Sequence, residues 1–220
     1  EGELERWFPE RIERRKLLRW TGERVEARVE RRLGTIVLAQ GPDPDPDSDA
    51  IVDMLVDKFL ENPAKLIPQN LLARAAHAGL VQFSSGSLQE SASVWLRPLL
   101  EGRRDLKLSG GKLTDALLGM LDWESRKKLD RVTPREFISP AGTSHRIDYA
   151  GEDAPSVEVR VQALFGLERH PMIGKVPLLL KLTSPAGRPV QATRDLPAFW
   201  RGSWADVRKD MKGRYPKHRW

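Results

Sequence analysis

The chain has 220 residues, of which 40% are hydrophobic and 31% charged, and its formal net charge is +6. This composition is typical of a soluble globular protein of one or two domains, and no apolar run reaches the ~18 residues that a membrane span needs. The absence of cysteine excludes disulfides, thiolate catalysis and most structural zinc sites, and it favours a reducing, cytoplasmic location. Charges interrupt the opening residues and exclude a secretory signal, and the missing initial Met indicates a piece of a longer polypeptide.

Segment 1–40 is expected to be a β segment. Val25, Ala27 and Val29 alternate with charged residues, and this period of two favours a strand over the helix with which the spacing is also compatible. Residues 35–38 are apolar and β-branched, which predicts a second short strand. We expect these strands to pack on the C-terminal sheet and to complete it.

An acidic stretch follows, with a local charge of −6 over residues 41–63. Residues 41–47 read GPDPDPD, and because a residue before proline is pushed away from the helical region, this is expected to be an extended linker. Ser48 or Asp49 is then expected to cap a helix that stops at Pro63.

Segment 41–132 is expected to comprise this linker and a compact helical subdomain. Its helix signals follow one another at short spacing. They are Pro68 before a buried face closed by Gly79, a capping box of Ser87 and Glu90, and two short helices over residues 112–121 and 122–129.

Segment 133–220 is expected to be a β subdomain with a C-terminal helix and a basic tail. Apolar and polar residues alternate in 157–162 and again in 175–183, which predicts strands. The tetrapeptide SPAG occurs at 139–142 and 184–187, and its proline and glycine favour hairpin turns at both places. The expected fold class is therefore α+β, with a helical subdomain and a small antiparallel β unit for which a barrel-like arrangement is one alternative.

The last twenty residues carry seven Lys or Arg against two Asp, interleaved with aromatic residues. Cations neutralise phosphates and aromatic rings stack on bases, so this mixture indicates a nucleic-acid surface. For the cations, a phosphate contact and a surface without a ligand are equally compatible with the sequence. The candidate nucleic-acid-binding residues are Arg201, Arg208, Lys209, Lys212, Arg214, Tyr215 and Lys217.

The local structure of this segment also follows from its spacing. A stripe of Trp200, Trp204, Val207 and Met211 is expected on one helix, and the core interpretation is favoured for its tryptophans. Further signals are Asp195 as a cap, a capping box of Ser203 and Asp206, a helix end at Gly213 and an extended tail over 214–220.

Catalytic and metal-binding patterns are weak. Residues 109–114 (SGGKLT) lack the spacing of a phosphate-binding loop, so a glycine turn before a helix is favoured. The four histidines have no ligand-like spacing, and Asp148 with its acidic neighbours Glu152 and Asp153 indicates a solvated loop. We predict no catalytic residue and no metal site.

Five segments resemble, in the same order, segments of the HrpB family of bacterial DEAH-type ATP-dependent RNA helicases. They are 31–38, 137–150, 159–167, 176–191 and 187–220. The last of them, GRPVQATRDLPAFWRGSWADVRKDMKGRYPKHRW, is the longest and most specific.

This resemblance implies two RecA-like motor domains N-terminal to Glu1, which hold ATP and Mg²⁺ in the intact protein. None of the motor motifs is in this chain, so the chain alone is expected to need no cofactor and to have no enzymatic activity. Its implied role is to grip or guide single-stranded RNA beside the motor domains of the same polypeptide. The alternative is a protein-interaction or structural module that braces the helicase core or docks a partner.

Overall fold

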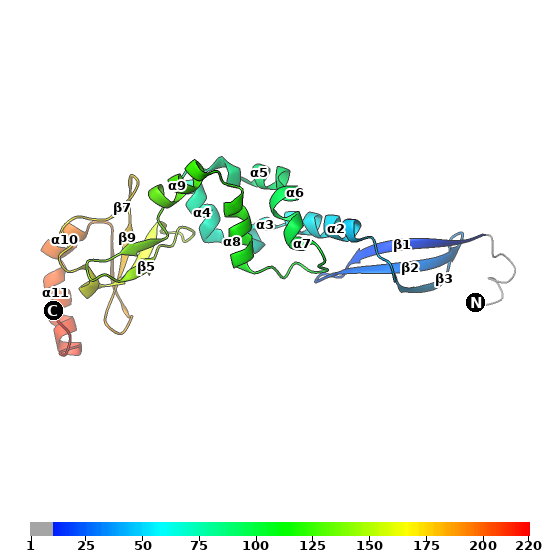
Figure 1. Cartoon of the computed structure of the whole chain (residues 1–220). Coiled ribbons are helices and arrows are strands. Elements are labelled where there is room, and N and C mark those ends of the chain that lie inside the picture. The colour runs from blue at the N-terminus through cyan, green and yellow to red at the C-terminus, as the bar shows by residue number, and fades with distance from the viewer. Residues whose placement is uncertain (1–10) are drawn as a thin grey trace. The chain divides into compact units, whose positions relative to one another are not determined.

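The computed structural model describes residues 11–220, and the chain divides into two compact units, which are described separately (Figure 1). Unit 1 contains Glu1–Pro68 and Ser85–Met120, and unit 2 contains Gln69–Ser84 and Leu121–Trp220. Each unit takes two stretches of the chain, so the division differs from the three consecutive segments expected from the sequence. No helix among residues 11–220 is long and apolar enough to cross a membrane.

Unit 1 begins with a three-stranded antiparallel sheet in the order β1-β2-β3. Its strands are β1 (Ile12–Trp20), β2 (Val25–Leu33) and β3 (Ile36–Pro42). The strand prediction for β2 is confirmed, and Val25 and Ala27 are buried on one face of it. Apart from a bridge at the start of β2, where the Val25 amide donates to the Arg104 carbonyl at 2.7 Å, the described strands form ladders only with one another, so they make a sheet of their own and do not complete the C-terminal sheet.

The acidic stretch leads into helix α2 (Ser48–Leu60). Asp47 caps this helix, because its side chain accepts hydrogen bonds from the amides of Asp49 and Ala50 at 3.0 and 3.1 Å. The prediction of Ser48 or Asp49 as the cap is therefore wrong by one or two positions. Arg97 donates to Asp49 at 2.8 Å and to Asp53, which ties the acidic first half of α2 to a second segment of unit 1.

Short helices complete unit 1. They are α3 (Pro63–Leu66), α5 (Ser85–Glu90), α6 (Ala92–Trp95), α7 (Arg97–Leu100) and α8 (Gly110–Gly119). Ser87 lies inside α5, so the capping box expected at Ser87 and Glu90 is wrong. Ser109 accepts a hydrogen bond from the Lys112 amide at 3.3 Å and caps α8, so Gly110 and Gly111 belong to the first turn of this helix and do not form a separate glycine turn before it. The core includes Phe59 against Trp95, edge to face at 5.6 Å.

Unit 2 contains three helical segments before its strands. They are α4 (Gln69–His77), the 3₁₀ helix η2 (Val81–Phe83) and α9 (Trp123–Val132). Gly79, at φ 66°, closes α4 as predicted. Arg74 of α4 is only 3% exposed and donates to the Thr133 carbonyl and to Asp130, the latter at 2.5 Å, and thus holds the end of α9.

Unit 2 also contains a mixed sheet in the order β10-β9-β6. Its strands are β6 (Ser156–Arg160), β9 (Leu179–Thr183) and β10 (Pro189–Thr193). Between β6 and β9 lie the 3₁₀ helix η3 (Val161–Leu164) and the two-stranded β7 (Met172–Ile173) and β8 (Val176–Pro177). This long connection returns the chain to the starting end of β6, so β9 runs in the same direction as β6 and pairs with it in parallel. The α+β class is confirmed, but the sheet is not purely antiparallel and does not close into a barrel.

Both SPAG segments form hairpin turns, as predicted. The first joins β4 (Glu136–Ile138) to β5 (Ser144–Arg146), and the second joins β9 to β10. In each copy the serine amide donates to the carbonyl four residues ahead, at 3.0 Å from Ser139 and 2.8 Å from Ser184. The glycines Gly142 and Gly187 have φ of 77° and 75°, a conformation that favours glycine. The two turns are therefore alike in hydrogen bonding as well as in sequence.

The core of unit 2 lies between the sheet and the helices α10 (Leu196–Arg201) and α11 (Trp204–Arg214). Val157 and Val159 of β6 meet Leu180 and Leu182 of β9 in it, because alternate side chains of a strand share a face. Tyr149 is also buried, and it donates from its hydroxyl to the Pro134 carbonyl at 2.7 Å. Burial raises the pKa of Tyr149 to about 12.

Candidate nucleic-acid interface

Helices α10 and α11 hold the basic C-terminal segment on the core of unit 2. The expected stripe of Trp200, Trp204, Val207 and Met211 is divided between these two helices, which Gly202 separates, so the single-helix prediction is wrong. Met211 is buried, and the other three are partly buried against the core. The core interpretation of the two tryptophans is thereby confirmed.

Ring contacts fix the tryptophans in place. Trp204 meets Trp200 at 5.3 Å with an angle of 86° and meets Phe165 at 5.5 Å. The indole nitrogen of Trp200 donates to the Leu167 carbonyl at 3.0 Å. Such ring pairs contribute about 0.5–1.5 kcal/mol each beyond the area they bury, so this cluster anchors the start of α11 firmly.

The candidate cations surround this anchor and are all exposed. They are Arg201, Arg208, Lys209, Lys212, Arg214 and Lys217. Arg214 is paired with Asp210 at 2.9 Å, and Arg208 donates to the Trp220 carbonyl at 3.1 Å. Lys209 and Lys212 form no ion pair with any residue of 11–220, so their charges stay available to an external anion.

The C-terminal tail folds back on unit 2, so its prediction as an extended segment is wrong. Helix α11 runs through Gly213 to Arg214, and the Tyr215 amide donates to the Met211 carbonyl at 2.7 Å. The Trp220 indole nitrogen then donates to the Tyr215 carbonyl at 2.8 Å. Ser203 precedes α11 without a side-chain capping bond, so the capping box expected there is also wrong, whereas Asp195 caps α10 as predicted.

A groove of about 690 Å³ opens between the two SPAG turns, β6 and the folded tail. The first turn contributes Ala141, and the second contributes Pro185 and Gly187. The other lining residues are Thr143, His145, Glu158, Val159, Arg160, Gln162, Ala163, Thr183, His218 and Arg219. The candidate Tyr215 is half-buried, and its hydroxyl lies 3.5 Å from Ser184 Oγ at the start of the second turn.

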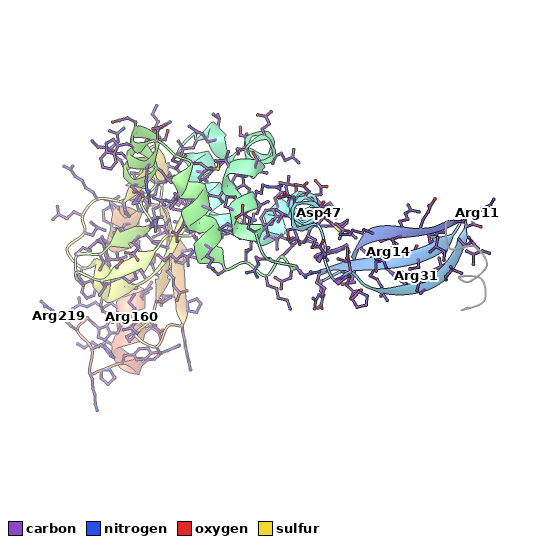
Figure 2. All side chains as sticks on the ribbon, turned by 45° about the vertical axis from the view of Figure 1, so that its right-hand side comes forward. Arg11, Arg14, Arg31, Asp47, Arg160 and Arg219 are labelled. Atoms are coloured by element: carbon purple, nitrogen blue, oxygen red, sulfur yellow. The ribbon has the colours of Figure 1, made fainter. Side chains whose placement is uncertain are left out.

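Two polar side chains of the groove are placed by the alternation of side chains along β6. Since Val157 and Val159 point into the core, Glu158 and Arg160 point outward from β6. Figure 2 labels Arg160 and Arg219, which supply guanidinium groups from the strand and from the tail. Gln162 follows on η3, and its Nε2 is buried without a hydrogen-bond partner among the described residues.

The groove residues were missed by the sequence analysis, which placed the candidate interface on the C-terminal segment alone. A signal for them was present in the repeated SPAG turns and in the polar face of 158–162 opposite the valines. Neither signal says that the two turns lie beside each other, because that depends on the parallel pairing of β6 with β9. The structure thus brings a groove next to the tail that carries the predicted cations.

The β1/β2 ladder of unit 1 pairs charged residues across the two strands. Arg14 and Arg31, both labelled in Figure 2, are directly opposite each other in the β1/β2 register. The neighbouring pairs Glu13 with Arg32 and Arg15 with Glu30 combine opposite charges.

The remaining polar patterns have structural roles. Asp148 accepts from the amides of Ala150 and Gly151 at 2.9 and 3.2 Å, which confirms the loop interpretation. His170 contacts the Leu178 carbonyl at 2.8 Å through Nε2, and its Nδ1 accepts from the Leu196 amide at 3.1 Å. Burial lowers the pKa of His170. Within residues 11–220 no three His, Asp or Glu side chains gather in a way that could hold a metal ion.

Comparison with known proteins connects these features to a family. The family HrpB_C, described as ATP-dependent helicase C-terminal, matches residues 95–220, which is more than half of the chain. The ATP-dependent RNA helicase HrpB of Escherichia coli K12 is 43% identical over 137 residues, which cover 61% of this chain and 17% of that protein.

Two solved structures are similar over nearly the whole chain. The crystal structure of the E. coli DExH-box NTPase HrpB matches with a TM-score of 0.70 and 29% identity, covering 100% of this chain and 29% of that one. The crystal structure of the Escherichia coli DEAH/RHA helicase HrpB matches with a TM-score of 0.63 and 28% identity, covering 96% and 29%. The chain spans less than a third of the length of these relatives. From its matched residues, the chain belongs to the HrpB family of ATP-dependent helicase C-terminal regions.

Proposed function

We propose that the chain is the accessory C-terminal region of an ATP-dependent RNA helicase and that it grips or guides single-stranded RNA through the surface of α11 and its tail. The E. coli relative is named an RNA helicase, which makes RNA the polyanion to test first. ATP and Mg²⁺ belong to motor domains outside this chain in the proposal, and the chain contributes binding surface only. In this proposal the protein acts in the cytoplasm.

The observation that carries this proposal is the charge of one face of α11. Lys212 lies four residues after Arg208 and three after Lys209, which puts the three cations next to one another on the exposed part of α11, with Arg208 bordering the buried Met211. Like charges four residues apart, such as Arg208 and Lys212, destabilise a helix by several tenths of a kcal/mol. A phosphate backbone that runs along this face offsets the repulsion and releases its own counterions.

The proposal is tested by titrating a labelled single-stranded RNA oligomer with the full chain at a series of salt concentrations. We expect the affinity to fall steeply with salt, with a log–log slope of about −0.7 for each neutralised phosphate. Changing Arg208, Lys209, Lys212 and Arg214 together to alanine is expected to flatten this slope. Affinity too weak to measure at low salt, or an unchanged slope in a variant whose circular dichroism is native, would show that this surface does not bind RNA.

Protein docking is the second candidate, and a different feature supports it. The β7–β8 hairpin of unit 2 exposes Met172 by 51% and Val176 by 40%. Because Met172 pairs with Pro177 and Val176 with Ile173, the two exposed side chains lie on opposite faces of the hairpin, and a partner that holds the hairpin from both sides would cover them. The test is binding of the full chain to separately prepared motor domains. Docking is favoured if this binding is lost when Met172 and Val176 are changed to serine and is kept in the α11 variant.

A further inference from the structure

We infer that the groove between the two SPAG turns is a subsite for one nucleotide of the bound strand, with the base against Gln162 and the phosphate against Arg160 and Arg219. This inference rests on the proposed RNA binding of unit 2, and it adds the chemical group that is recognised and the residues that recognise it. It locates contact with one base and its phosphate in the groove and leaves neutralisation of the neighbouring phosphates to α11.

The groove has the size and the rigid walls of a small-ligand site. Its volume of about 690 Å³ lies within the range of about 300–1,000 Å³ that is usual for ligand pockets. Both walls are turns closed by their own hydrogen bonds, at 2.9 Å from Gly142 to Ser139 and from Gly187 to Ser184. The Ala141 amide also reaches the Ala163 carbonyl at 3.4 Å. A ligand therefore meets walls that are already formed.

Gln162 is the residue that points to a ligand. Its amide nitrogen has no solvent contact and no partner among residues 11–220, and buried donors in native proteins are nearly always paired. The last torsion of a glutamine side chain is broad, so a small turn presents this nitrogen or the amide oxygen to the groove. A base edge offers the carbonyl or ring nitrogen that this donor lacks.

The other groove residues suit the remaining parts of a nucleotide. Glu158 accepts from an exocyclic amino group, and the imidazoles of His145 and His218 offer planar faces for stacking. Arg160 and Arg219 exceed the single carboxylate of Glu158 in charge, so the groove favours an anion. Bases of single-stranded RNA are free to enter such a site, because their edges are not paired.

The subsite can be tested without an RNA strand. Calorimetry or chemical-shift changes measure the binding of nucleoside 5′-monophosphates to the full chain. Ribose 5-phosphate serves as the probe that lacks a base. We expect at least one monophosphate to bind about five-fold or more tightly than ribose 5-phosphate, which corresponds to one good hydrogen bond. Gln162→Leu is expected to remove this preference, whereas the matched Gln82→Leu, in the same unit but outside the groove, keeps it.

A second pair of variants separates phosphate from base. Changing Arg160 and Arg219 to alanine is expected to weaken every monophosphate and ribose 5-phosphate by a similar factor. If the monophosphates bind no better than ribose 5-phosphate, or if Gln162→Leu behaves like Gln82→Leu, the subsite is refuted. RNA binding that is lost in the α11 variant would still uphold the proposed function in that case. A Gln162-dependent preference without RNA binding would uphold the subsite and refute the proposed function.

Discussion

Replacing Lys209 and Lys212 together with alanine is expected to remove about two phosphate contacts from the RNA complex. Both side chains are exposed and have no ion-pair partner among residues 11–220, so each is free to neutralise one phosphate. At about 0.7 per phosphate, the log–log salt slope should become shallower by about 1.4. If this variant and the unchanged protein bind RNA equally near 1 M salt, the variant's affinity is lower by about 25-fold at 0.1 M salt and by about five-fold at 0.3 M salt.

Fluorescence anisotropy of a labelled single-stranded RNA at four or more salt concentrations measures this slope. Lys127→Ala with Lys128→Ala is the matched control, because both residues are exposed on α9 of the same unit and the net charge changes equally. Asp210→Asn tests the same reasoning in the other direction. It frees Arg214 from its 2.9 Å ion pair, so the affinity should rise and the slope should steepen.

A control pair on α9 that flattens the salt slope as much as the pair on α11 would contradict this prediction. Such a result would mean that net charge, and not the placement of the cations on α11, determines the binding. A lower RNA affinity of a correctly folded Asp210→Asn variant would contradict it as well.

Three further predictions concern stability. Arg74→Ala is expected to lower the free energy of unfolding by about 3–4 kcal/mol in urea denaturation, because the buried stem and the bond to Thr133 are lost; Arg74→Met keeps the stem and should cost about 2 kcal/mol. His170 has a lowered pKa in the folded state, so the stability it supports is present above pH ~6.5 and lost as the pH falls below it, by at most about 1.4 kcal/mol per pH unit. In His170→Gln this part of the pH dependence of the melting temperature should vanish. Trp204→Ala is expected to lower the free energy of unfolding by about 2–3 kcal/mol and to leave the RNA salt slope unchanged.

A specific result would contradict each of these three predictions. Equal losses in Arg74→Ala and Arg74→Met would show that packing of the stem contributes little. A stability that rises on acidification from pH 7.5 to 5.5 relative to His170→Gln would mean that the folded state favours the charged imidazole. A shallower salt slope in a folded Trp204→Ala protein would give this ring a direct role in RNA contact.

Local features of the fold were largely predictable, because they depend on residues close together in the chain. Helix α4 closes at Gly79 because glycine readily adopts a positive φ. Asp195 caps α10 because its side-chain oxygen accepts from a free amide of the first turn. The two SPAG turns follow from proline and glycine. Strand β1 was not singled out, because its cations obscure the alternation that revealed β2.

Errors arose where a neighbouring residue competes for the same local role. Asp47, Ser48 and Asp49 are all good caps, and only the course of the chain after Pro42 decides that Asp47 accepts the bonds. Gly213 lies within α11 and not at its end, since α11 continues to Arg214. Helical spacing alone also joined Trp200 to Trp204, although Gly202 separates their helices.

The sequence by itself determined that the chain is an α+β protein with a cationic C-terminal segment anchored by tryptophans, because composition and short-range spacing carry that information. Only the tertiary structure decided that β6 pairs with β9 in parallel, that the tail returns to Tyr215, and that Arg160, Gln162 and Arg219 share one groove. These three residues are separated by up to 59 positions, and such long-range proximity depends on how packed strands and turns meet, not on the local preference of any residue.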